Sequence, residues 1–297
     1  MVTHRRCVGR DIIRRERQKS NSGIGCFSPV AFRIGVGNLA FSMRILTRLV
    51  LVVAVLGTLA SCMPWRRSKP AAEAIPAGPG RLVVSWLGHG CFLVTSSIGI
   101  SVLTDPFSPK AVGYSYPRAL RADVVLTSNE SELANYVEPV GGNPLLLRSR
   151  LAAGVTRANG ILFRGVPFGS AEDAGDGSGV NVAFAWTLDG IRFAHLGSPK
   201  RVPFPEELAQ LGGADIVFVP VGGALSREQI DPLLDRMGAR IAVPMAYRTP
   251  KATRPGIGSI DPFLAGRTNV TRLAEPGFSL SPGGLPETPA IFVPALP

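Results

Sequence analysis

Short apolar runs, separated by turns rich in glycine and proline, dominate the chain from Arg81 onward. Runs of this length, with β-branched and aromatic residues, predict strands rather than helices. The first three are closely spaced and predict a β-meander, and Asp189-Gly190 predicts a hairpin between two later strands. The predicted strands of this first part are residues 81–88, 91–96, 99–107, 121–128, 161–168, 180–190 and 191–198.

The pattern changes after residue 200, where strands alternate with helices. Residues 203–213 predict a short helix with proline near its start and glycine at its end, and residues 226–238 predict an N-capped helix. Buried strands are predicted at 214–223 and 239–247, and an edge strand at 285–297. Strands followed by alternating strands and helices indicate an α/β (α+β) domain in which helices enclose sheets.

The net charge is concentrated at the N-terminus. The 297 residues carry a formal charge of +11, and residues 1–61 hold ten Lys/Arg and two Asp/Glu, a net of +8. Subtracting leaves +3 for residues 62–297. The globular part is therefore close to neutral, which argues against nucleic acid as a partner.

Residues 43–61 have the pattern of an export signal. Two arginines precede a short apolar core, and the segment ends in Leu-Ala-Ser before Cys62. This ending resembles a bacterial lipobox, so we expect Cys62 to be lipidated and to tether the protein to membrane lipid in the cell envelope, on the periplasmic side of the outer membrane. An ordinary signal peptide or a signal anchor is the alternative.

The remaining N-terminal segments follow from that signal. Residues 1–42 precede a complete signal and indicate a start assigned too far upstream, with an extended leader as the alternative. Residues 62–80 are rich in Pro, Ala and Gly and predict a flexible tether ahead of a domain at 81–297. The mature chain would keep Cys91 as its one unmodified cysteine, which excludes an intramolecular disulfide.

Six segments of the domain resemble, in order and spacing, the metallo-β-lactamase superfamily. They are "VSWLGHGCFLV", "VLTDPF", "ADVVLTS", "IRFAHLGS", "ADIVFVPVGG" and "ARIAVPMAY". The branch that they resemble most contains ascorbate-phosphate-lactonase-like and phosphodiesterase-like metal-dependent hydrolases. The resemblance implies a four-layer αββα sandwich with an active site at the edge between two sheets.

The resemblance also implies metal ligands that this sequence lacks. The family pattern is Thr-His-x-His-x-Asp-His at the end of a strand, followed by later His, Asp and His ligands that together hold two cations. At the corresponding positions the chain has Ser128, Glu130, Glu132, Leu133, Ser170, Ser198 and Ala246. The histidines left in the mature chain are His89 and His195, and neither occupies a ligand position.

Two functions follow from this departure. The first is a catalytically degenerate protein without a metal, acting as an envelope binding or scaffold module with a small ligand or a protein in the former cleft. The alternative is a hydrolase of phosphoester or lactone bonds whose divalent cation is held by Glu130 and Glu132, with Asp105 or Asp173. In the first interpretation, Glu130 and Glu132 are solvated residues at the start of a helix.

The other polar candidates lie near the same strand ends. His89, Asp105 and His195 would line the pocket, and we expect His89 and Asp105 to bond the backbone of turns. Cys91 would be a nucleophile with His89 or His195 as its base, or a packed core residue. His195 and Ser198 suggest a Ser/His pair without an orienting acid.

Overall fold

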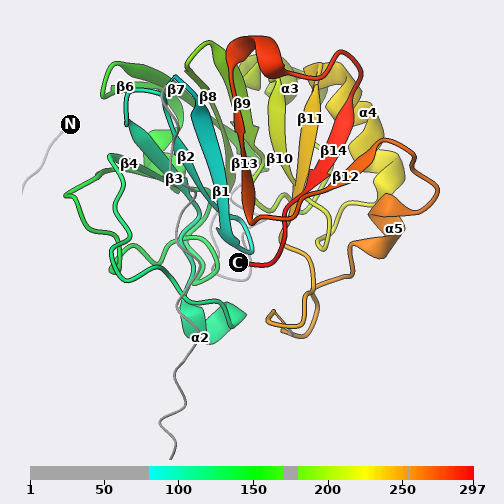
Figure 1. Ribbon diagram of the computed structural model, residues 1–297, viewed down its shortest axis with the longest axis horizontal. Coiled ribbons are helices and arrows are strands. Elements are labelled where there is room, and N and C mark those ends of the chain that lie inside the picture. The colour runs from blue at the N-terminus through cyan, green and yellow to red at the C-terminus, as the bar shows by residue number, and fades with distance from the viewer. Residues whose placement is uncertain (1–79, 170–179, 253) are drawn as a thin grey trace, which may run out of the picture. The chain divides into compact units, whose positions relative to one another are not determined.

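The computed structural model describes residues 80–169, 180–252 and 254–297, all within one compact unit, Ser68–Pro297 (Figure 1). The predicted leader, signal, lipidated Cys62 and tether up to residue 79 lie outside these residues. Ser170 and Asp173 lie outside them as well. In the part that is described, no helix is long and apolar enough to cross a membrane.

The first sheet has six strands in the order β13-β1-β2-β3-β4-β5. The predicted meander is confirmed, because β1, β2 and β3 pair antiparallel in sequence order. β13 pairs with β1 although the two are far apart in the sequence (Figure 1). The strands are β1 Leu82–Gly88, β2 Cys91–Thr95, β3 Ser101–Thr104, β4 Val124–Thr127, β5 Leu145–Arg148 and β13 Gly277–Leu280.

The second sheet has eight strands in the order β12-β14-β11-β10-β9-β8-β7-β6. The hairpin at Asp189-Gly190 joins β8 to β9, and both turn residues have positive φ, 50° and 76°. From β9 to β12 the neighbouring strands are parallel. The strands are β6 Gly154–Ala158, β7 Ile161–Phe168, β8 Asn181–Leu188, β9 Ile191–His195, β10 Ile216–Pro220, β11 Ile241–Met245, β12 Val270–Arg272 and β14 Ala290–Val293.

The predicted edge strand near the C-terminus is wrong in one respect. Residues Ala290–Val293 form β14, but β12 pairs with its outer side, so β14 is an internal strand. β12 has only three residues, Val-Thr-Arg, which are too few and too polar to show an alternating pattern in the sequence.

The two helices predicted after residue 200 are confirmed. α3, Pro205–Leu211, begins with proline and ends before Gly212, and α4, Arg227–Met237, begins after Ser226. The side chain of Gln229 accepts a hydrogen bond from the Ser226 backbone N–H at 2.9 Å, which satisfies a free donor at the start of α4. The shorter helices are α2 Pro109–Val112, η1 Ser149–Ala152, α5 Asp261–Leu264 and η3 Pro282–Gly284.

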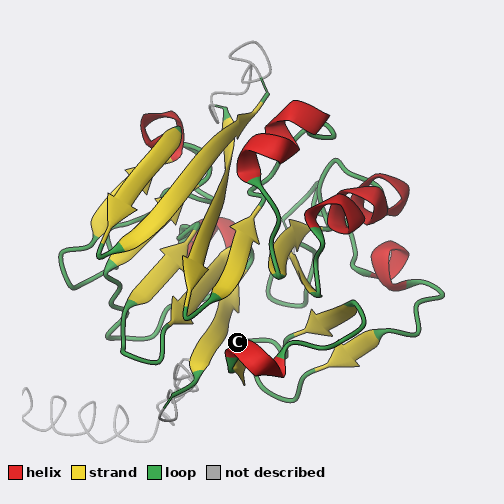
Figure 2. Ribbon diagram, turned by 90° about the horizontal axis from the view of Figure 1, so that it is seen from above, coloured by secondary structure: helices red, strands yellow, loops and turns green. Residues whose placement is uncertain are grey.

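The two sheets pack face to face around one apolar core, with the helices outside the strands (Figure 2). Phe92 of the first sheet stacks on Phe218 of the second with ring centroids 4.2 Å apart. Trp86 and Trp186 are buried in the same core. The four-layer αββα class is therefore confirmed.

The outer layer over the six-stranded sheet is thin. It consists of α2 and long connections, and a second apolar cluster that includes Phe107 and Tyr114 lies beneath them. The helix start expected at Glu130 is absent, because residues 129–140 form bends, turns and irregular backbone. Asn129 explains part of this, since its side-chain oxygen accepts hydrogen bonds from the N–H and hydroxyl groups of Ser131, which holds a local turn.

Candidate functional site

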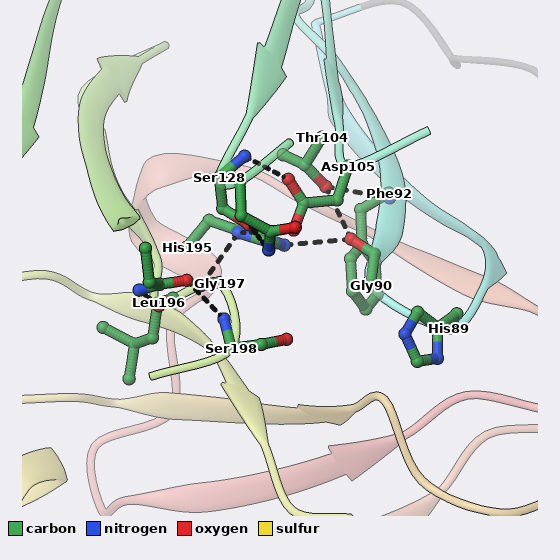
Figure 3. A network of polar contacts seen from close by, with 12 residues as sticks. His89, Gly90, Phe92, Thr104, Asp105, Ser128, His195, Leu196, Gly197 and Ser198 are labelled. Atoms are coloured by element: carbon green, nitrogen blue, oxygen red, sulfur yellow. Dashed lines mark hydrogen bonds and ion pairs between the residues drawn. The ribbon is translucent and has the colours of Figure 1, made fainter. Parts of the chain in front are cut away.

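Polar residues from both sheets gather where their parallel strands end. Asp105 follows β3, Ser128 follows β4 and His195 ends β9. Because the carboxyl ends of parallel strands share one edge of a sheet, such edges commonly carry ligand sites in α/β proteins. Figure 3 shows these three side chains together, with Gly90 and Gly197 beside them.

Asp105 is the centre of this network. Its Oδ1 accepts a hydrogen bond from the backbone N–H of Ser128 at 2.7 Å, and its Oδ2 accepts one from the Ser128 hydroxyl at 2.6 Å. The side chain is buried, and burial raises the pKa of this carboxyl, while His195 and the bonds from Ser128 oppose the rise. The expected bond from the backbone to Asp105 is present, and its φ of 36° indicates backbone strain at this point.

His195 connects the two sheets. Its Nε2 lies 2.9 Å from the carbonyl oxygen of Gly90, and its Nδ1 accepts a hydrogen bond from the N–H of Gly197 at 3.2 Å. An Nδ1 that accepts leaves the proton on Nε2, which then donates to Gly90. Asp105 Oδ2 is 3.9 Å from Nδ1, so a carboxyl group lies beside the imidazole without a hydrogen bond to it. The bonds of His195 go to Gly90 and Gly197, and the suggested pair with Ser198 is not formed.

Two residues that sequence reasoning missed hold the surrounding loops. Thr104 Oγ1 donates to the Gly90 carbonyl at 3.0 Å. Asn181, at the start of β8, donates to the Leu196 carbonyl at 2.9 Å and accepts from the Ser198 N–H at 2.6 Å. Neither residue carries a recognisable signal, because a polar residue at a strand end is common and its partners are distant in sequence.

His89 is separate from the network. It is 6% exposed, has a φ of 50°, and its Nδ1 has no hydrogen-bond partner among the described residues (Figure 3). Burial lowers the pKa of the imidazole to about 4, with smaller contributions from the charges of Arg254 and His195. The imidazole is therefore neutral at pH 7. The expectation that its side chain bonds the turn does not hold for Nδ1; the backbone carbonyl of His89 makes those bonds instead, from Trp86 Nε1 and the Ala246 N–H.

The two glutamates after β4 are exposed. Glu130 Oε2 accepts a hydrogen bond from Asn135 at 2.6 Å, and Glu132 Oε1 forms an ion pair with Arg254 at 2.9 Å. The other positions that were predicted to correspond to family ligands differ in how deeply they are buried. Ser128 and Ala246 are buried, Leu133 is half-buried and Ser198 is exposed.

Cys91 is a core residue. Its side chain is completely buried, and burial raises the pKa of the thiol well above its ordinary value. The thiolate is the reactive form of cysteine, so this thiol is unsuited to be a nucleophile. The alternative interpretation as a packed residue agrees with the structure.

The donors at this edge suit a hard cation better than zinc. Among the described residues, no group of three or more His, Cys, Asp or Glu side chains is placed to hold a metal ion. Zinc sites in proteins are built mainly from imidazole and thiolate ligands. Glu130 and Glu132 offer carboxylate oxygens, and Mg²⁺ is commonly held by one or two carboxylates together with water and substrate phosphate.

Comparisons with known proteins agree with the fold. A family model described as the β-lactamase superfamily domain matches residues 83–246. A metal-dependent hydrolase of the UPF0173 family from Methanoculleus marisnigri is 26% identical over 67% of this chain and 96% of its own length. A UPF0173 protein from Pyrococcus abyssi is 29% identical over 56% of this chain and 83% of its own.

A solved structure and a third relative agree with the first two comparisons. A Thermotoga maritima member of the metallo-β-lactamase superfamily, provisionally named a zinc-dependent hydrolase, superposes with a TM-score of 0.60 at 26% identity. The match covers 73% of this chain and all of that one. A UPF0173 relative from Archaeoglobus fulgidus, 24% identical over 56% of this chain and 83% of its own, also carries the name metal-dependent hydrolase.

These names overturn the first of the two functions inferred from the sequence. The interpretation as a catalytically degenerate scaffold is wrong, because relatives that align along most of their length are named metal-dependent hydrolases. That interpretation relied on the absence of histidine ligands alone. It gave too little weight to oxygen donors, which can hold a different class of cation.

Proposed function

Because the chain belongs to the metallo-β-lactamase superfamily, we propose that it is a hydrolase of phosphoester or lactone bonds that uses a divalent cation at Glu130 and Glu132. The observation that carries the proposal is the position of these carboxylates. Both are exposed on the loop that follows β4, two and four residues after Ser128, which bonds to Asp105. A bound cation would supply Lewis-acid polarisation of the substrate and a more acidic water.

The chain's own residues hold this edge in a fixed geometry. The two bonds from Ser128 to Asp105 join the ends of β3 and β4, and the bond from His195 to Gly90 joins the end of β9 to the turn after β1. Preorganised positions of this kind lower the cost of orienting a substrate. Arg254 directs the side chain of Glu132 through their ion pair.

His89 keeps a neutral imidazole inside the fold. Its Nδ1 is buried and has no hydrogen-bond partner among the described residues, so it is an unsatisfied polar atom that costs free energy. With a pKa of about 4, His89 can accept a hydrogen bond or donate one without adding charge.

The test is a hydrolase screen on the purified protein. We would assay nitrophenyl phosphomonoesters, phosphodiesters and a lactone after dialysis against a chelator, then with Mg²⁺, Mn²⁺ or Zn²⁺ added. We expect activity to return with Mg²⁺ or Mn²⁺ and to be lost in Glu130→Gln/Glu132→Gln. Glu138→Gln, which changes an exposed glutamate on the following connection, is the matched control. Full activity in the double variant would refute the proposed site.

A further inference from the structure

A surface cavity of about 480 Å³, largely open to solvent, lies beside Glu132. Three separate segments line it: α2 with Gly113, the loop after β4, and the loop after β11. Its size is within the range of small-molecule sites in proteins. The lining residues are Lys110, Ala111, Val112, Gly113, Glu132, Lys251, Arg254 and Pro255.

The lining carries excess positive charge. Three cations face one carboxylate, and that carboxylate, Glu132, pairs with Arg254. Lys251 lies 5.6 Å from the centre of the Tyr114 ring and donates to the Pro297 carbonyl oxygen. Lys110 is exposed at the end of α2. This surplus contrasts with the nearly neutral domain around it.

The segments that carry these cations are fixed to one another. The Ser108 N–H, just before α2, donates to the Glu132 carbonyl at 2.7 Å. The Tyr114 hydroxyl, just after α2, lies 2.6 Å from Thr249 Oγ1. Gly113 allows the Lys251 backbone to pack closely, since a Cβ at this position would collide with the Lys251 carbonyl oxygen. The cavity is therefore built before any ligand arrives, which limits the entropy lost on binding.

We propose that this cavity binds the phosphate group of a phosphomonoester, with Lys110, Lys251 and Arg254 as its ligands. A guanidinium and two ammonium groups suit a dianion with several acceptor oxygens. The assignment deepens and rests on the proposed function, since it selects phosphoesters over lactones as substrates. Glu132 also has a part in it: its carboxylate competes with the phosphate for Arg254, so occupancy of the cavity releases Glu132 to bind the cation.

The position of Arg254 connects the cavity to the rest of the site. Its charge acts on His89, whose buried Nδ1 has no partner, and it pairs directly with Glu132. A phosphoester held by the three cations would thus lie next to Glu132, one of the carboxylates that the proposed function uses.

The test is calorimetric titration of the full chain with glycerol 3-phosphate at low salt and without metal. We expect saturable binding that weakens about tenfold in Lys110→Gln, Lys251→Gln and Arg254→Gln, the effect of one lost charged hydrogen bond. Glu132→Gln should bind more tightly than the wild type. The control is Arg236→Gln, which removes an exposed cation from α4. All these side chains are exposed, so the variants should fold.

Two results would overturn the assignment: no saturable binding by the wild type, or binding that is unchanged in the three cation variants. A lipid headgroup can present the same phosphate, so vesicles of phosphatidylcholine with and without phosphatidic acid are compared with the soluble ester. Binding of the soluble ester or of the vesicles that is weakened in the three cation variants supports the cavity. Which of the two binds shows whether the phosphate comes from a soluble ester or from a lipid headgroup. If phosphate binds but no ester is cleaved with any metal, the proposed hydrolase fails while the cavity stands. If esters are cleaved at unchanged KM in the cation variants, the cavity fails while the hydrolase stands.

Discussion

The substitution His89→Asn tests whether the buried imidazole makes the fold sensitive to acid. The pKa of His89 is lowered from 6.5 to about 4 in the folded protein, by burial first and then by the charges of Arg254 and His195. Between these two values the unfolded chain binds a proton that the folded protein does not. Stability therefore falls as the pH decreases from about 6.5 toward 4, and is restored as it rises.

The magnitude follows from the two pKa values. Linkage gives a loss of about 2 kcal/mol between pH 7 and pH 5, and about 3 kcal/mol by pH 4, from this residue alone. Asparagine tolerates the positive φ of this position and does not titrate, so His89→Asn removes the effect and keeps the backbone conformation. Asp105, whose raised pKa contributes with the opposite sign, is present in both proteins and cancels in the comparison.

The assay is urea unfolding of both proteins at several pH values, followed by the fluorescence of the buried Trp86 and Trp186. We expect the wild type to lose about 2 kcal/mol more than the variant between pH 7 and pH 5. Any cavity left by the smaller side chain lowers stability at every pH and does not alter this difference. Equal slopes in the two proteins would refute the neutral, buried state of His89.

Other substitutions test the packing of the site and the N-terminal predictions. Gly197→Ala should destabilise the fold by at least about 2 kcal/mol in urea unfolding, because its Cβ would collide with Asn181 and lie 2.7 Å from the Ser128 Cβ. The control is Gly154→Ala, which is also at positive φ but has open space around it. Equal losses of stability in the two variants would contradict the clash. Ser128→Ala should cost about 1–3 kcal/mol, since Asp105 Oδ2 loses its donor, whereas the exposed Ser198→Ala should cost little; the same unfolding curves decide between them. We also propose that Cys62 is lipidated, so Cys62→Ala should release the protein from membrane fractions, and continued processing after Ser61 with lipid association would contradict this. A chain begun at Met43 should be exported like the full sequence, and loss of export would restore residues 1–42 as a true leader.

Much of the architecture could be read from the sequence because its determinants are local. The short apolar runs, the Asp189-Gly190 turn and the proline and glycine at the ends of residues 203–213 each specify their own segment, and the structure confirms all three. The position of β14 could not be read in this way. Whether a strand lies at an edge depends on a partner elsewhere in the chain, here the three residues of β12.

The candidate site likewise has features that the sequence alone determines and features that depend on the tertiary structure. The sequence alone determined that no histidine follows β4 in residues 128–133 and that Glu130 and Glu132 are the acids there; the correspondence of these positions to the family's metal ligands stays a prediction. Only the tertiary structure decided that Asp105, Ser128 and His195 meet, that His89 Nδ1 is buried without a partner, and that Lys110, Lys251 and Arg254 surround one cavity. These groups come from separate strands and loops, and only the folding of two sheets onto one core brings them together, because residues so far apart in sequence have no local pattern that records their contact.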